Sequence, residues 1–292
     1  MKNYPFIHLR TQSSYSLSES ALKIKKIVEL AKFYKMPAIA LTDNNNLFGA
    51  LEFSIECSSN GIQPIIGTTI NLLDIQDELI PSQINLLVKN EIGYRNLMYL
   101  SSISHTKQDD VVGINIENLK KYSKGLLCYL GGKYNPLFLL HNQKKLSHEK
   151  KLITTLIDIF TDNLYIELQR INDSQLDDYE SRFIKISNEY SIPLIASNNI
   201  KYESAEDHIA HDALLCIEQK STVNQNNRIF SNPETYFKST EKMKDIFNDI
   251  PDIIENNFKV ALKCQFYPEE LTPKLPKFIN KNNLSETELL IK

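Results

Sequence analysis

The stretch FIHLRTQSSYSLSES, residues 6–20, decides the fold of this chain. Its apolar first half predicts a strand over Phe6–Arg10, its polar middle predicts a loop, and Ser20 predicts a helix N-cap. A strand, a polar loop and a helix in this order form the unit from which a parallel α/β barrel builds its catalytic rim. The side chains of this unit that would form the first wall of such a rim are His8, Arg10, Gln12 and Glu19.

The same alternation of apolar strands and 3.6-periodic helices continues to residue 219, which indicates a parallel barrel or a doubly wound sheet. The chain has six or seven strand–helix units and no GxGxxG motif, which favours the barrel over the doubly wound sheet. Strands are expected at 6–10, 38–43, 62–73, 84–88, 125–130, 164–168 and 193–200. Helices are expected from Ser20 to about residue 34 and at 47–59, 91–104, 119–122, 147–160, 176–190, 206–218, 240–247 and 251–264. Residues 219–232 form a polar excursion without periodicity.

The bulk composition argues against several classes of function. The 292 residues carry 33 Lys and Arg against 36 Asp and Glu, so there is no basic excess of the kind that a DNA-gripping domain usually has. No secretory signal and no apolar run of membrane-spanning length is present. Four scattered cysteines suit a reducing compartment and are expected in the core. We expect a soluble, cytoplasmic protein with no membrane partner.

Several blocks make the chain resemble a known family over about residues 5–288. They are HLRTQSSYSL, MPAIALTDNNNLFGALEF, GIQPIIGTTINL, NEIGYRNLMYLSS and AHDALLCI. The chain resembles the N-terminal PHP (polymerase and histidinol phosphatase) domain of bacterial DNA polymerase III alpha subunits. The resemblance implies a distorted (β/α)7 barrel over residues 1–265, including C-terminal helices at 235–265. It also implies an extended connector over 266–292, leading to a C-family polymerase body beyond residue 292.

Metal-binding members of this family carry nine His, Asp, Glu or Cys ligands around as many as three ions. The residues that the resemblance places in this vestigial site are Arg10, Gln12, Glu19, Asp43, Asn44, Thr69, Gln83, Gly132, Ile171, Asn199 and Lys201. Only Glu19 and Asp43 of this set are acidic, and Asp43 itself precedes the ligand position, which holds Asn44. A cluster of divalent ions needs several anionic or imidazole ligands, and two cations in the pocket would repel it. We therefore expect no catalytic residue and no metal.

Charged side chains are expected to take the place of the metals. A carboxylate at a buried strand end is costly if it is unpaired. Arg10 is therefore expected to neutralise Asp43, and Lys201 to pair with Glu19.

The resemblance implies an inactive barrel that braces the polymerase body and docks the separate proofreading exonuclease (epsilon) subunit. The parent chain would be a DNA-directed DNA polymerase, a nucleotidyltransferase, that contacts other replisome subunits and DNA and uses Mg²⁺ only in its palm. Three alternatives stay open. They are an active metal-dependent 3′–5′ exonuclease or phosphoesterase, a free-standing enzyme like histidinol phosphatase, and residual pyrophosphate hydrolysis by Asp43 and Glu19.

Other polar groups allow a functional or a structural interpretation. His208 and His211 have an i, i+3 spacing that can bind zinc, but without a third ligand packing or capping is favoured. Ser13, Ser14 and Ser16 lack a nucleophile-elbow motif and are interpreted as turn and cap residues. Lys144, Lys145, Lys150 and Lys151 form a charge run that is interpreted as a solvated helix face.

Overall fold

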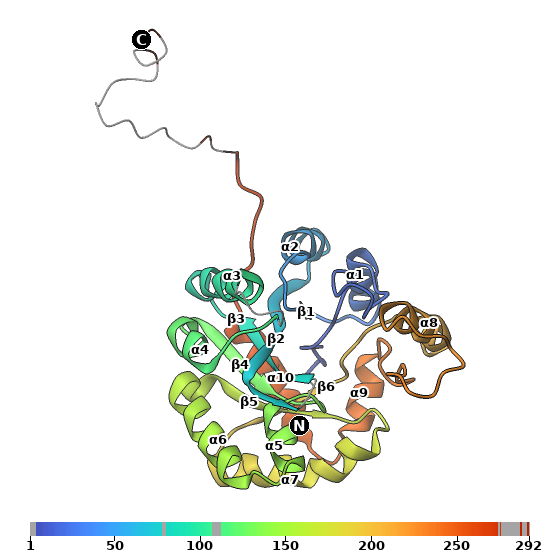
Figure 1. Ribbon diagram of the computed structural model, residues 1–292. Coiled ribbons are helices and arrows are strands. Elements are labelled where there is room, and N and C mark those ends of the chain that lie inside the picture. Colours follow the sequence, from blue (N-terminus) through green and yellow to red (C-terminus); the bar gives the residue numbers. More distant parts are fainter. Residues whose placement is uncertain are drawn as a thin grey trace.

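One curled sheet of six strands forms the centre of the molecule, and helices surround it (Figure 1). The structure is a computed structural model that describes residues 4–77, 80–106 and 112–273, together with Leu275, Thr287 and Ile291. The strands, in sheet order, are β1 Ala38–Asn44, β2 Gln63–Asp77, β3 Ile80–Val88, β4 Leu126–Leu130, β5 Leu164–Gln169 and β6 Leu194–Ser197. Most of the connector expected at 266–292 lies outside the described residues.

Ten α-helices are described. They are α1 Ile24–Phe33, α2 Ala50–Ser59, α3 Glu91–Thr106, α4 Ile116–Tyr122, α5 Pro136–Asn142, α6 Leu146–Phe160, α7 Ser174–Tyr190, α8 His208–Glu218, α9 Thr240–Ile246 and α10 Pro251–Lys263. Short 3₁₀ turns occupy Thr161–Asn163 and Ala205–Asp207. None of the described helices is both long and apolar enough to span a bilayer.

The prediction of a wholly parallel sheet is wrong at β3. The pairs β1–β2, β4–β5 and β5–β6 are parallel, whereas β3 runs antiparallel to both β2 and β4. The connection between Asp77 and Ile80 is of hairpin length, and a parallel crossover needs a dozen or more residues. The sheet is therefore a mixed one in which a long hairpin replaces one β/α unit.

The segment predicted as the first strand lies in a strand position without forming a regular strand. On one side, the His8 carbonyl accepts a hydrogen bond from the N–H of Ala40 in β1 at 2.9 Å. On the other side, the Arg10 carbonyl accepts from the N–H of Ile200 at 3.2 Å, and Gln12 N–H donates to the Ile200 carbonyl at 2.9 Å. This segment therefore bridges β1, at one edge of the sheet, and the chain just after β6, at the other.

Two local predictions need correction. Ser20 does not cap a helix, because α1 begins only after Lys23; its hydroxyl instead lies 2.8 Å from the carbonyl oxygens of both Gln12 and Lys201. Helix α5 was not predicted. The pair Asn135-Pro136 is its signal, since the Asn135 side chain accepts from the N–H of Leu137 at 3.0 Å and proline is favoured at the first helical position.

Both faces of the sheet are buried, because successive strand residues point to opposite sides. Ile39 and Leu41 of β1 pack in the core between sheet and outer helices. Ala38 and Ala40 face the inside of the curl, where Val260 of α10 joins their cluster. All four cysteines are buried and free, as expected for core thiols.

Helix α10 also completes the sheet with a side chain. The buried Asn257 amide accepts a hydrogen bond from Ala196 N–H at 2.9 Å and donates to the carbonyls of Ala196 and Ile7 at 2.7 and 3.0 Å. It thus satisfies backbone groups that a regular strand ladder between β6 and the first segment would have paired.

Candidate functional site at the carboxyl ends of the strands

Arg10 forms a buried ion pair with Glu167, the carboxylate near the end of β5. Its Nη1 donates to Glu167 Oε2 at 2.8 Å and lies 3.4 Å from the Gly131 carbonyl, and the two side chains are only 5% and 0% exposed. Ser197 at the end of β6 donates to the other Glu167 oxygen. The hypothesis that Arg10 neutralises Asp43 is therefore wrong. This pairing was not predicted from the sequence, although Glu167 inside the apolar run LYIEL, residues 164–168, indicated a buried carboxylate.

Asp43 is satisfied by serines. Its carboxylate accepts from the Ser13 N–H at 2.7 Å, the Ser13 hydroxyl at 2.8 Å and the Ser16 hydroxyl at 2.7 Å. Burial raises the pKa of Asp43 above its ordinary value, and the hydrogen bonds from Ser16 and Ser13 oppose that rise. The cap interpretation of Ser13 and Ser16 was thus incomplete, because these hydroxyls hold a carboxylate on the neighbouring strand.

Four of the predicted residues form a chain of polar contacts at the rim of the curled sheet, near the carboxyl ends of its parallel strands. Gln12 donates to Asn44 Oδ1 at 2.9 Å, and Asn44 in turn donates to the Glu19 carboxylate. The Lys201 ammonium lies 3.9 Å from that carboxylate, as expected for this pair. Burial lowers the pKa of Lys201, Arg10 acts in the same direction, and Glu19 opposes both.

The remaining predicted residues are dispersed around this centre. Gly132 has a φ of +73°, and a side chain there would begin 3.2 Å from Arg10 Nη1, so glycine leaves room for the guanidinium. Thr69 donates to Asn85 Oδ1 at 2.7 Å, Gln83 donates to Asn71 Oδ1 at 3.3 Å, and the buried Ile171 contributes only a carbonyl, to Asn232. Asn199 has a φ of +48°, and its Oδ1 is buried without a hydrogen-bond partner among the described residues.

His8 is a core residue and does not form a wall of the site. Its side chain is fully buried, with ring centroids 4.9 Å from those of Phe6 and Phe237. Nε2 lies 2.8 Å from the Lys238 carbonyl oxygen. Burial lowers the pKa of His8 to about 4, so the ring is neutral at physiological pH.

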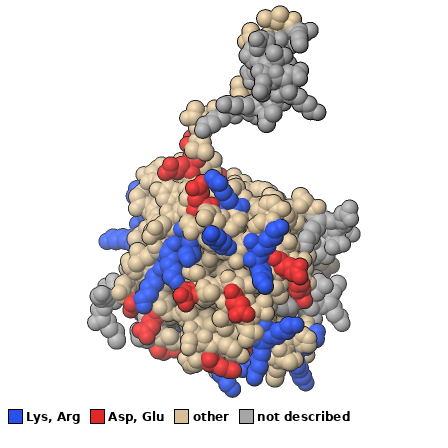
Figure 2. Space-filling view, turned by 90° about the vertical axis from the view of Figure 1, so that its left-hand side faces the viewer, with Lys and Arg blue, Asp and Glu red and all other residues tan. Residues whose placement is uncertain are grey.

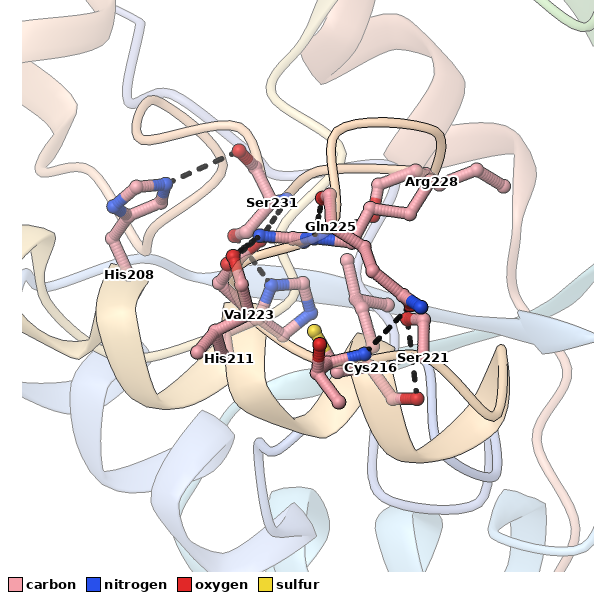
Figure 3. A network of polar contacts seen from close by, with 12 residues as sticks. His208, His211, Cys216, Ser221, Val223, Gln225, Arg228 and Ser231 are labelled. Carbon is pink, nitrogen blue, oxygen red and sulfur yellow. Dashed lines mark hydrogen bonds and ion pairs between the residues drawn. The ribbon is translucent and has the colours of Figure 1, made fainter.

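The two histidines of α8 hold a surface segment in place (Figure 3). His208 Nε2 lies 3.1 Å from the Ser231 carbonyl, and His211 Nδ1 lies 2.6 Å from the Ser231 hydroxyl. His211 Nε2 also lies 2.8 Å from the Glu19 carbonyl oxygen. In the structure, this pair of imidazoles therefore packs and forms hydrogen bonds with protein groups, as the structural interpretation expects. Through His211, residues 219–232 are thus linked to Glu19 at the rim of the curled sheet.

The residues at this rim do not fit a catalytic metal cluster. Across the described ranges, no group of three or more His, Cys, Asp or Glu side chains is arranged to hold an ion. Glu167 is engaged by a guanidinium, Asp43 by serines and Glu19 by an amide and an ammonium. Hard divalent cations need several free oxygen ligands, and the two cations in this rim oppose their entry.

The family described as PHP domain matches residues 8–171, more than half of the chain. The chain therefore belongs to the PHP domain family.

Similar relatives are alpha subunits of DNA polymerase III. It is 40% identical over 98% of its length to the DNA polymerase III subunit alpha of Rickettsia bellii, and 37% identical over 96% of its length to that of Borreliella burgdorferi. The chain spans about a quarter of these relatives, 24% and 26% of their lengths.

Among solved structures, the chain aligns with a two-domain protein from Bacteroides vulgatus that contains a predicted PHP-like metal-dependent phosphoesterase. The TM-score is 0.46 and the identity 11%, covering 90% of this chain and 70% of that one. A likeness this weak carries no conclusion about activity.

Breaking the Arg10–Glu167 pair on one side should be costly. Arg10→Met leaves a fully buried carboxylate unpaired, and we expect it to lower the free energy of unfolding by about 3–5 kcal/mol in urea denaturation. Arg10→Met combined with Glu167→Met should cost less than either single change. The matched control is Arg95→Met, whose partner Glu91 lies 2.6 Å away at the exposed surface and whose loss should cost less than about 1 kcal/mol. Equal losses for Arg10→Met and Arg95→Met would contradict this assignment.

Asp43 should make stability depend on pH in a defined direction. Because its pKa is raised in the folded chain, ionisation of Asp43 favours the unfolded state. This cost is absent at low pH, grows as pH rises through about 3.8, and becomes constant above the folded pKa. The free energy of unfolding of the unmodified chain, minus that of Asp43→Asn, should therefore fall across this window. A difference that rises instead would show that the serine hydrogen bonds outweigh desolvation.

Proposed function

We propose that this chain is the PHP domain of a DNA polymerase III alpha subunit, with a phosphoesterase site that no longer holds catalytic metals. The proposal rests on which side chains stand at the rim and on the protein groups that each of them contacts. The positions where metal-binding relatives need ligands hold Arg10, Gln12, Asn44 and Lys201, and each of these side chains contacts another protein group. Such a rim stabilises the barrel by itself and has no free ligand set for an ion.

A barrel of this kind acts as a scaffold in our proposal. It braces the polymerase body of a longer chain that performs DNA-templated DNA synthesis in the cytoplasm. It also docks the separate proofreading exonuclease subunit, because a domain without a hydrolytic centre cannot remove mismatched nucleotides. The similarity to the alpha subunits of Rickettsia bellii and Borreliella burgdorferi supports this assignment.

The metal content of the purified chain tests the loss of the site. After dialysis against manganese and zinc, elemental analysis should find far less than one ion per chain, and a chelator should leave the melting temperature unchanged. A zinc phosphoesterase carried through the same dialysis is the positive control. Nuclease and phosphoesterase assays should show no activity that Asp43→Asn or Glu19→Gln removes. Two or three tightly held ions, with hydrolysis lost in these variants, would overturn the proposal in favour of an active exonuclease.

Docking of the exonuclease subunit needs its own test. Size-exclusion chromatography of the chain mixed with the proofreading subunit of the same organism should give a joint peak of the summed mass. Separate elution at concentrations of tens of micromolar would contradict the docking role while leaving the result on metals intact.

A further inference from the structure

A set of lysines that have no carboxylate partner among the described residues lies over α4 and α6, on the opposite side of the molecule from α8 (Figure 1). The turn before α6 and its first half contribute four of them, and α4 with the residues just after it contributes three. All seven side chains are exposed, and none lies within 4.0 Å of a carboxylate in the described part of the chain. They are Lys120, Lys121, Lys124, Lys144, Lys145, Lys150 and Lys151.

Two of the acidic residues near these lysines are engaged elsewhere. Glu149 of α6 is buried against Arg182, and Glu91 of α3 pairs with Arg95 at 2.6 Å. Asp74, Glu117 and Asp158 are exposed, so the seven lysines outnumber these exposed carboxylates. Figure 2 shows this side of the molecule, where Lys and Arg side chains gather with separate carboxylates between them. A local basic excess therefore exists on a chain whose net charge is −3.

A cleft joins the two lysine-bearing helices. It has a volume of about 380 Å³ and lies between Ile116, at the start of α4, and the first half of α6. Lys145, His148 and Lys151 line it, with Asp74 as its single carboxylate among the described lining residues. The cleft thus offers a recess beside α6 in which two lysines and a histidine outnumber one carboxylate.

Two tyrosines extend this face toward α3. The rings of Tyr99 and Tyr122 lie 4.3 Å apart, centroid to centroid, and Tyr99 is 49% exposed. Lys121 Nζ lies 5.2 Å from the centroid of the Tyr122 ring. Tyr122 itself is partly buried, so Tyr99 presents the more exposed ring of the pair. An exposed ring beside lysines is a combination on which single-stranded nucleic acids bind, since bases stack on rings and phosphates lie near ammonium groups.

We propose that the face formed by these seven lysines, the cleft, Tyr99 and Tyr122 binds single-stranded nucleic acid without sequence preference. This binding would be a function additional to the scaffold role. It does not depend on that role, because the residues lie on the outer helices, away from the rim around Arg10. Lysines alone would also attract an acidic protein segment. The half-exposed ring of Tyr99 beside these lysines favours nucleic acid, because bases stack on aromatic side chains and an acidic peptide has no such requirement.

Fluorescence anisotropy of the intact 292-residue chain with a labelled oligothymidylate of about 20 nucleotides tests the proposal. We expect binding in the micromolar range at about 50 mM salt, weakening steeply toward about 200 mM. Lys120→Glu with Lys121→Glu should weaken binding about tenfold or more and reduce the slope of log affinity against log salt by about 1.4, which is about 0.7 per lost phosphate contact. Tyr99→Ala with Tyr122→Ala should weaken binding and leave the salt slope unchanged.

The matched control reverses the charge at two exposed lysines elsewhere on the molecule. It combines Lys25→Glu on α1 with Lys185→Glu on α7. This variant makes the same change in net charge, and we expect its affinity to stay within about twofold of the unmodified chain. Equal weakening by the control would overturn the proposal, because binding would then follow net charge alone. Binding of polyglutamate but not of the oligonucleotide would also overturn it, and would assign the face to an acidic protein. Circular dichroism of each variant checks that it is folded.

Discussion

The ion pair between Arg10 and Glu167 is the interaction around which the interior of this curled sheet is arranged. It links the irregular first segment to β5, and both side chains are withdrawn from water. A buried pair is stable only if its geometry is good and its remaining atoms are satisfied. Ser197 and the Gly131 carbonyl supply those contacts, and an added side-chain carbon at Gly131 would overlap Glu167. The shapes of three neighbouring strand ends therefore depend on one charge pair.

The same constraint explains why the rim resembles a site and yet fits no metal cluster. Each carboxylate that could serve as a ligand already has a partner of its own: Arg10 for Glu167, Ser13 and Ser16 for Asp43, and Lys201 for Glu19. An ion would have to displace these partners and lie beside two cations. His211 reinforces the arrangement from outside, because it connects the Glu19 backbone to the segment that follows α8.

The sequence predicted the six strands of the sheet and most helices because their apolar periodicity is strong and local, whereas the strand expected at 6–10 is not a regular one. It could not predict that β3 runs antiparallel, since strand direction depends on a connection of two residues and not on the strand itself. The Glu19–Lys201 pair was predicted correctly, whereas Arg10 was assigned to the wrong carboxylate. Asp43 and Glu167 both stand near strand ends, and only the curvature of the sheet decides which one the guanidinium reaches. The serine partners of Asp43 were missed because serine is common both as a turn residue and as a hydrogen-bond donor to a carboxylate. The residue type alone does not distinguish these two roles.

The central claim is that protein side chains stand where metal-binding relatives hold ions. Crystals soaked in manganese and measured at the manganese absorption edge test it most directly. The account predicts no anomalous peak near Glu19, Asp43 or Glu167, with Arg10 still in contact with Glu167. One or more peaks at the rim, with these carboxylates turned away from Arg10, the serines and Lys201, would contradict it.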